Sequence, residues 1–374
     1  MSQNYLFILI LFVLSISCEP SKSLKVQLLK ELDNLKREHV VDNSLEFNDL
    51  NIDQSNGKYI ITGMTSNENL FIDLCNYVEE NTIISKVLLL PDTSLKDSTY
   101  GIVNVSVAPI REKPSHMSQM IDQSILGNTL KILYANEDWY LCQTHYNYVG
   151  WITKSVVSRC DSSQYSNWNS KARHKITKVN SFIYSAPFLS SKPISDLVLN
   201  SRLKVNFFNN DWLETILPNN KIGYVLNNDI EIDSSDLQGR EFKVVLLEKA
   251  YSMMGVPYLW GGNSSKGNDC SGFVQTVYTA LNISLPRDAR QQAKLGTLIK
   301  PENAEIGDLF FFGQDDRVTH VAISIGGLDY IHQGAKFEGR VCINSLNPSS
   351  TTYSKYRYET FLFAKRPFTH KNEN

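Results

Sequence analysis

The chain of 374 residues has no excess of charge of either sign, with 37 basic and 39 acidic residues and no long block of like charge. Because nucleic-acid binding depends on clustered Lys and Arg, this balance argues against nucleic acid as a partner. The length allows about two to four domains. The composition, 42% hydrophobic, is typical of a globular protein.

The spacing of the cysteines argues against two further classes of protein, those with a cysteine-bound metal and those held together by many disulfides. The six cysteines match neither a metal signature nor a dense disulfide framework, so no metal or cofactor is predicted. They are Cys18, Cys75, Cys142, Cys160, Cys270 and Cys342. In an oxidising compartment Cys142 and Cys160 could form a bridge, and the sequence alone leaves this pairing open.

The apolar run at the N-terminus, residues 5–14, is too short to span a bilayer comfortably. Small and polar residues follow it and end at Cys18. This pattern resembles a bacterial lipoprotein signal, in which the cysteine is lipidated and becomes the mature N-terminus. Residues 1–18 are therefore predicted to be a signal peptide that exports a membrane-anchored lipoprotein to the periplasm or the cell surface. A plain secretory signal or a retained short anchor is the alternative.

Residues 19–97 are predicted to form a small α+β domain of unknown role. Apolar periodicity predicts helices over residues 24–40 and 70–78, and strands over residues 59–62 and 87–90. No residue cluster in this segment suggests chemistry, which favours a packing or spacer domain.

An internal repeat follows, with an offset of 73 residues between Trp139 and Trp212. The same offset relates Gly150 to Gly223, and it also relates Ile110 to Ile183, Pro114 to Pro187 and Leu130 to Leu203. Short strands separated by polar turns predict two small β-barrels, residues 98–162 and 163–234. The repeat resembles bacterial Src-homology-three-type modules, which bind cell-wall peptides or shape an enzyme cleft. Both tryptophans are expected to be core residues rather than ligand platforms.

Residues 235–370 have a different pattern, with helices first and strands afterwards. Helices are predicted over residues 242–254 and from Cys270 onward, and the predicted strands cover residues 308–312, 318–325, 330–332 and 341–343. This order is typical of an α+β domain with an antiparallel sheet.

Cys270 is predicted to lie in the first turn of a helix. Unpaired backbone N–H groups and the positive end of the helix dipole favour its thiolate, the reactive form of cysteine. With a histidine nearby, such a thiol is a nucleophile for an electrophilic carbonyl.

Two histidines, His320 and His332, are candidates for that role. His320 shares a strand face with Ala322 and Ser324, while the alternate residues point into a core. A turn at Gly326-Gly327 would pair the strand of His332 beside it, so that one imidazole acts as base and the other orients it. The alternative is that Cys270 is a buried apolar residue and both histidines lie on the surface.

The chain resembles the NlpC-type cysteine peptidases, which have a papain-like fold and cut bacterial cell-wall peptides. The resemblance covers residues 240–370 and rests on Tyr258-Leu259-Trp260-Gly261-Gly262, Asp269-Cys270-Ser271-Gly272, Leu285-Pro286-Arg287-Asp288, Gly307-Asp308-Leu309-Phe310-Phe311, Thr319-His320-Val321-Ala322-Ile323 and Ile331-His332. The two Src-homology-three-type modules before this domain narrow the resemblance to the γ-D-glutamyl-L-diamino-acid endopeptidases. The resemblance implies hydrolysis of murein peptides between D-Glu and meso-diaminopimelate or L-Lys, without a cofactor.

The resemblance also implies the site residues. Cys270 would be the nucleophile, His320 the base and His332 the third member. Tyr258 would line the oxyanion region or the pocket, and Asp269 and Ser271 would hold the free amine of the substrate's L-Ala. Arg287 and Asp288 would border the same pocket, with Arg287 the partner of the D-Glu α-carboxylate.

In this subfamily the first module also reaches the cleft with an acid and a tyrosine. Glu112 is the candidate acid, because Ser185 occupies its position in the second repeat. Tyr146 and Tyr148 are the candidate tyrosines, between which the sequence does not choose. A buried acid left without its cation would disfavour blocked amines, which predicts action on freed peptides. The alternatives are a remodelling hydrolase of intact peptidoglycan and a non-catalytic wall-binding lipoprotein, and no obligate protein partner is evident.

Overall fold

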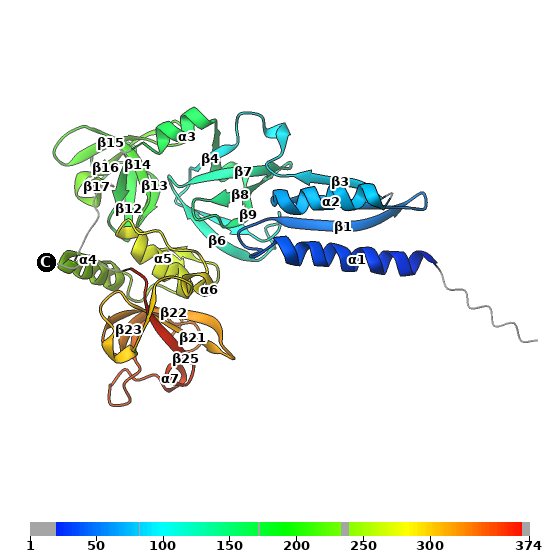
Figure 1. Ribbon diagram of the computed structural model, residues 1–374. Coiled ribbons are helices and arrows are strands. Elements are labelled where there is room, and N and C mark those ends of the chain that lie inside the picture. Colours follow the sequence, from blue (N-terminus) through cyan, green and yellow to red (C-terminus); the bar gives the residue numbers. More distant parts are fainter. Residues whose placement is uncertain (1–19, 82, 171–172, 233–238, 369–374) are drawn as a thin grey trace, which may run out of the picture. The chain divides into compact units, whose positions relative to one another are not determined.

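The computed structural model describes residues 20–81, 83–170, 173–232 and 239–368 (Figure 1). It divides into two compact units, one of residues 20–43 and 48–89, the other of residues 44–47 and the chain from residue 90 onward. The predicted signal peptide and Cys18 lie outside the described residues. Within the described ranges, no helix combines the length and the apolar character needed to cross a bilayer.

The first unit is a small α+β fold. Its elements are α1 (Pro20–His39), β1 (Asn48–Ser55), β2 (Lys58–Thr65), α2 (Glu68–Glu80) and β3 (Ile84–Leu89). The strand order is β1-β2-β3, with β1 antiparallel to β2 and β3 parallel to it across α2. Strand β1 was not predicted, because only Leu50 and Ile52 of its eight residues are buried and the remainder are polar or charged.

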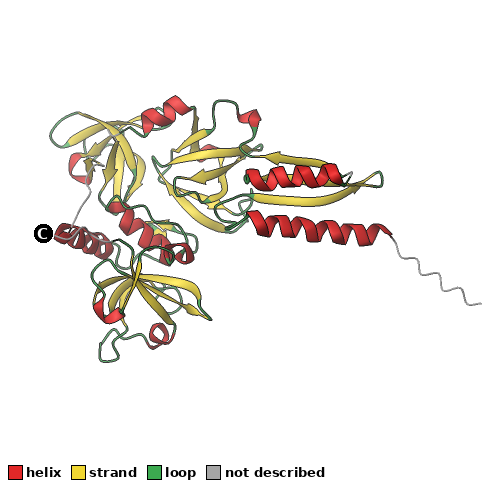
Figure 2. Ribbon diagram, viewed as in Figure 1, coloured by secondary structure: helices red, strands yellow, loops and turns green. Residues whose placement is uncertain are grey.

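Two seven-stranded barrels follow, and strands dominate this part of the chain (Figure 2). The first comprises β4 (Tyr100–Val103), β5 (Val107–Arg111), β6 (Met120–Ile125), β7 (Thr129–Ala135), β8 (Trp139–Thr144), β9 (Val149–Thr153) and β10 (Val157–Cys160). After α3 (Ser162–Trp168), the second comprises β11 (Arg173–Ile176), β12 (Asn180–Tyr184), β13 (Pro193–Val198), β14 (Arg202–Phe207), β15 (Trp212–Ile216), β16 (Ile222–Leu226) and β17 (Ile230–Ile232). The strand orders, β10-β4-β7-β8-β9-β5-β6 and β17-β11-β14-β15-β16-β12-β13, are the same topology.

The residues that recur at the 73-residue offset have the same structural role in both barrels. A side-chain carbon at Gly150 would collide with Ile110, and one at Gly223 would collide with Ile183. The backbone N–H groups of Trp139 and Trp212 each donate to an asparagine side chain three residues earlier. Both tryptophans are buried, which confirms that they are core residues.

The C-terminal part confirms the predicted order of helices followed by an antiparallel sheet. Its elements are α4 (Gly239–Ser252), β18 (Asn263–Ser264), β19 (Gly267–Asn268), α5 (Cys270–Ala280), α6 (Ala289–Gln292), β20 (Thr297–Ile299), β21 (Leu309–Gln314), β22 (Arg317–Gly326), β23 (Asp329–Gln333), β24 (Val341–Ser345), α7 (Lys355–Glu359) and β25 (Phe361–Arg366). Single 3₁₀ turns lie at Thr93–Leu95, Lys154–Val156, Asn227–Asp229 and Pro301–Asn303. The six-stranded sheet has the order β20-β25-β21-β22-β23-β24.

Both faces of this sheet are buried. Helices α4 and α5 lie on one side of the sheet (Figure 1). There Phe273 and Val277 belong to the same apolar cluster as Phe311, Val321 and Ile323. The opposite face is a second apolar cluster that includes Phe310, Phe312, Ala322 and Tyr330. The prediction that His320 lies on a small, polar strand face is therefore wrong, since aromatic rings cover that face and bury the imidazole.

The bridge between Cys142 and Cys160, which the sequence left open, is absent. Both cysteines are free and buried in different clusters, Cys142 in the core of the first barrel and Cys160 against Ile102 and Trp168. Burial of each thiol raises its pKa, Cys160 to about 11, which keeps both protonated.

Candidate active site

Cys270 is the first residue of α5, as the sequence predicted. Asp269 is the N-cap, with an extended backbone, and its Oδ1 accepts a hydrogen bond from the backbone N–H of Gly272 at 2.8 Å. This cap satisfies one of the orphan N–H groups of the first turn and fixes where the helix starts. The sulfur is thereby held at the positive end of a helix whose other residues are almost all buried.

The predicted lowering of the Cys270 pKa is wrong for the free protein. Burial raises the pKa of the thiol to about 11, and the negative charge of Asp269 adds to the effect. Desolvation and a neighbouring carboxylate both disfavour the thiolate more than the helix end favours it. Cys270 is therefore a thiol at neutral pH, and it needs a base to become a nucleophile.

The two histidines meet through the register of β22 and β23. Ile323 pairs with Ile331, so His320 and His332 are diagonal neighbours on one face of the sheet. His320 Nε2 lies 2.9 Å from His332 Nδ1. On the far side, His332 Nε2 lies 2.8 Å from Oδ1 of Asn344 on β24. These contacts form a chain of three polar side chains across three strands.

Asn344 determines the tautomer of both rings. Its Nδ2 donates to the carbonyl of Thr352 at 3.2 Å, which leaves Oδ1 as the acceptor that faces His332. His332 must then carry its proton on Nε2, and its Nδ1 accepts the Nε2–H of His320. His320 Nδ1 is left with a free lone pair, which makes it the nitrogen available to accept a proton in the cleft. Sequence reasoning missed Asn344, which lies one residue beyond the predicted strand 341–343, although alternation from Cys342 places both side chains on one face of β24.

Both imidazoles are neutral at physiological pH. Burial, with the positive charge of Arg357, lowers the pKa of His320 well below its usual value. The same two causes lower the pKa of His332 to about 3. A neutral His320 beside a protonated thiol is the correct resting state for a general base.

A cleft of about 470 Å³ contains both Cys270 and His320. Of the predicted site residues, the cleft is lined by Tyr148, Tyr258, Asp269, Cys270, Ser271, Arg287, Asp288 and His320. His332 lies behind His320 and is fully buried. Gln119 and Ile121 of the first barrel also line the cleft, opposite residues of the C-terminal part such as Lys336 and Arg357.

Arg287 does not have the predicted role of binding a substrate carboxylate. Nε donates to Asp122 at 2.7 Å, Nη1 to Asp269 and Ser271, and Nη2 to Asp269 at 2.6 Å and to the carbonyl of Gly262. A guanidinium has five N–H donors, and all five have protein acceptors here. Arg287 is therefore a buried clamp that holds the acids of the cleft floor.

The first barrel supplies an acid, but it is not Glu112. Glu112 is exposed between β5 and β6 and is absent from the cleft lining. The acid that meets the C-terminal part is Asp122 on β6, which is fully buried and paired with Arg287. The repeat contained this signal, because the 73-residue offset places Ser195 opposite Asp122.

The structure separates the two candidate tyrosines. Tyr148 lines the cleft, and its hydroxyl interacts with the carboxyl group of Asp288. The Tyr146 hydroxyl instead donates to Asp122 Oδ2 at 2.5 Å, outside the cleft lining. Tyr148 is thus positioned to contact a ligand, whereas Tyr146 supports the buried acid.

The charges beneath the cleft do not balance. Asp122 and Asp269 share the single guanidinium of Arg287, and Asp288 pairs with the more exposed Arg290 at 2.9 Å. Counted as ionised, the first cluster holds two carboxylates and one cation, so negative charge predominates beside Cys270, although burial raises the pKa of the Asp122 carboxyl. A positively charged ligand group would complete it.

Two family models match this chain. Residues 255–361 match the NlpC/P60 family, and residues 110–156 match the bacterial dipeptidyl-peptidase Sh3 domain. The first match contains Cys270, His320 and His332, and the second contains Asp122 and Tyr148. Both matches agree with the resemblance seen in the sequence.

Proteins of similar sequence match more of the chain than either family model does. The chain is 26% identical over 238 residues to a gamma-D-glutamyl-L-lysine dipeptidyl-peptidase of Bacillus cereus, covering 58% of this chain and 68% of that protein. It is 28% identical over 264 residues to dipeptidyl-peptidase 6 of Lysinibacillus sphaericus, covering 68% and 94%. The crystal structure of an NlpC/P60 family protein from Bacillus cereus superposes with a TM-score of 0.63 at 22% identity, covering 72% of this chain and 99% of that one. This last similarity establishes a shared fold.

Proposed function

Because residues 255–361 belong to the NlpC/P60 family of cysteine peptidases, we propose that this protein hydrolyses the bond between γ-D-Glu and a diamino acid in murein peptides. The diamino acid is meso-diaminopimelate or L-Lys. The observation that carries the proposal is the cleft, in which a thiol, a neutral imidazole and an excess of buried negative charge lie together. The relatives named for dipeptidyl-peptidase activity support the same substrate class.

The proposed reaction proceeds in two steps. His320 Nδ1 accepts the proton of the Cys270 thiol as the sulfur attacks the γ-carbonyl carbon of D-Glu. The C–N bond then breaks, the proton passes from His320 to the leaving amine, and a thioester remains. Water attacks the thioester while His320 accepts its proton, which returns to the sulfur as the S–C bond breaks. His332 accepts from His320 Nε2–H throughout and so stabilises the transient imidazolium.

Tyr258 is proposed to bind the oxyanion that forms during attack. Burial raises the pKa of its hydroxyl, and the neighbouring Cys270 and Asp269 raise it further. The hydroxyl therefore remains protonated and able to donate a hydrogen bond to a developing negative charge.

The substrate's free L-Ala ammonium is proposed to bind at Asp269 and Tyr148. Asp269 lines the cleft next to Cys270, and the cluster to which it belongs lacks one positive charge. An ammonium supplies that charge, whereas an amide at the same position leaves Arg287 as the one cation shared by Asp122 and Asp269. The proposed enzyme thus acts on freed peptides.

We expect N-acetylation of Ala-γ-D-Glu-diaminopimelate to lower kcat/KM by roughly 10²-fold or more. The measurement is mass spectrometry of the products of the free and acetylated tripeptides, which identifies the scissile bond at the same time. A tripeptide esterified at its C-terminus is the matched control and should be cleaved at a nearly unchanged rate. Equal turnover of the free and acetylated substrates would instead indicate a hydrolase of intact peptidoglycan.

We further propose that the protein is exported and lipidated at Cys18, on the basis of the apolar run and small residues that precede it. Cells that express the chain and are fed a labelled fatty acid should yield a labelled protein in the membrane fraction. Cys18→Ser should lose the label, while Cys75→Ser should keep it. Equal labelling of the two variants would contradict the anchor.

A further inference from the structure

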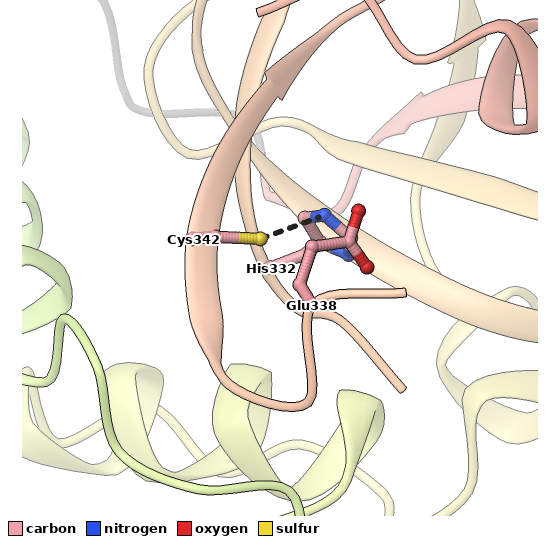
Figure 3. A group of neighbouring side chains, drawn as sticks. All are labelled: His332, Glu338 and Cys342. Carbon is pink, nitrogen blue, oxygen red and sulfur yellow. Dashed lines mark hydrogen bonds between the residues drawn. The ribbon is translucent and has the colours of Figure 1, made fainter. Parts of the chain in front are cut away.

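A second group of ligating side chains lies behind the histidine pair. His332 on β23, Glu338 in the following loop and Cys342 on β24 each present one ligand atom, and these atoms all lie within 4.8 Å of one another (Figure 3). The cleft lining includes none of the three residues. His332 is buried, and Glu338 and Cys342 are half-buried, so solvent reaches two of the three side chains.

The spacing of these atoms fits a tetrahedral metal ion. Cys342 Sγ lies 3.5 Å from His332 Nε2. Zinc–sulfur and zinc–nitrogen bonds of about 2.3 and 2.05 Å at a tetrahedral angle place S and N about 3.6 Å apart. The β23–β24 register, which pairs His332 directly with Cys342, sets this distance. The His332–Cys342 pair is therefore spaced for zinc without a change in the backbone, and the Glu338 carboxylate lies within 4.8 Å of both ligand atoms. Asn344 Oδ1, which lies 2.8 Å from His332 Nε2, must turn away to admit the ion.

The charges also suit a divalent cation. A Cys342 thiolate and the Glu338 carboxylate supply two negative charges, which neutralise Zn²⁺. Two cations oppose it, since the charge of Arg357 acts on His332 and the charges of Arg340 and Arg357 act on Cys342. Thiolate with imidazole is a donor set that prefers Zn²⁺ over Ca²⁺ or Mg²⁺.

We propose that His332, Glu338 and Cys342 form a zinc site that inhibits the peptidase. The inhibition rests on the proposed function, whereas the binding of the metal does not.

The physical basis of the inhibition is the tautomer of His332. Asn344 holds the proton of His332 on Nε2, and a metal bound at Nε2 displaces that proton to solvent. The ring must then carry a proton on Nδ1, which it takes from His320 Nε2. His320 in turn takes a proton from solvent on Nδ1, so both rings stay neutral. With Nδ1 occupied, His320 has no lone pair for the Cys270 thiol, and its imidazolium would face a second N–H donor at His332.

Cobalt(II) absorbance tests the binding without any substrate. The full-length Cys270→Ala variant, which lacks the cleft thiol, should develop a thiolate-to-cobalt charge-transfer band when titrated with Co²⁺. Zn²⁺ should remove the band by competition. Adding Cys342→Ala to this variant should abolish it, Glu338→Gln should weaken Co²⁺ binding by about tenfold or more, and Cys75→Ala should leave it intact. A band that persists without Cys342 overturns the site.

The inhibition is tested by Zn²⁺ titration of peptide hydrolysis, with each variant normalised to its own metal-free rate. Cys342→Ala should raise the half-inhibiting Zn²⁺ concentration by about tenfold or more, and Cys75→Ala should not change it. Equal inhibition of the wild type and Cys342→Ala would place the metal at Cys270 and overturn the inhibitory site. A cobalt band without zinc inhibition would overturn the tautomer mechanism. Failure of metal-free hydrolysis contradicts the proposed function instead.

Discussion

Cys270→Ala is expected to lower kcat for the tripeptide by roughly 10⁵- to 10⁶-fold, because it removes the atom that would form the thioester. The side chain is small and lies at a helix start, so the fold should be kept. Mass spectrometry of products measures the residual rate, and circular dichroism confirms folding.

Cys75→Ala is the matched control, since Cys75 is a half-buried thiol in the first unit. It should retain full activity. Hydrolysis that survives Cys270→Ala at more than about a hundredth of the wild-type rate would rule out Cys270 as the nucleophile.

Arg287→Met is expected to destabilise the C-terminal part by about 3–5 kcal/mol, because it leaves Asp122 and Asp269 buried without their cation. The side chain of Arg287 is only 2% exposed. The measurement is the urea midpoint of unfolding, followed by tryptophan fluorescence and by loss of activity. Arg287→Lys should recover only part of the loss, since an ammonium cannot occupy all five acceptors.

Arg290→Met is the control for this change. Arg290 is 48% exposed and pairs with Asp288. Its removal should cost no more than about 1 kcal/mol. Asp122→Asn combined with Arg287→Met should be less unstable than Arg287→Met alone, because one unpaired charge is gone. Equal midpoints for Arg287→Met and Arg290→Met would contradict the role of Arg287 as a clamp.

Local patterns in the sequence predicted much of the C-terminal fold. The helix at Cys270 and the strands that carry His320 and His332 follow from apolar periodicity and from the Gly326-Gly327 turn. The repeat predicted two barrels with buried tryptophans, and their common topology bears this out. Strand β1 escaped prediction because a sheet with few buried residues leaves little trace in hydrophobic alternation.

Polar roles that depend on distant partners were predicted less well. Glu112 and Asp122 lie ten residues apart in the sequence, and only the packing of β6 against the C-terminal part shows which acid meets Arg287. Arg287 has the charge of a carboxylate receptor, yet five protein acceptors surround it. Neither fact has a signature in the local sequence, since the acceptors of Arg287 lie between 16 and 165 positions away.

The sequence by itself determined the residue types proposed to carry the chemistry, their places on helix and strands, and the match of residues 255–361 to the NlpC/P60 family. These properties depend on short-range spacing. Only the tertiary structure decided the state of each group. Burial makes Cys270 a thiol rather than a thiolate, Asn344 selects the tautomer of His332, and the β23–β24 register places Cys342 beside it. Desolvation and cross-strand register are properties of the packed chain, which no local pattern of residues encodes.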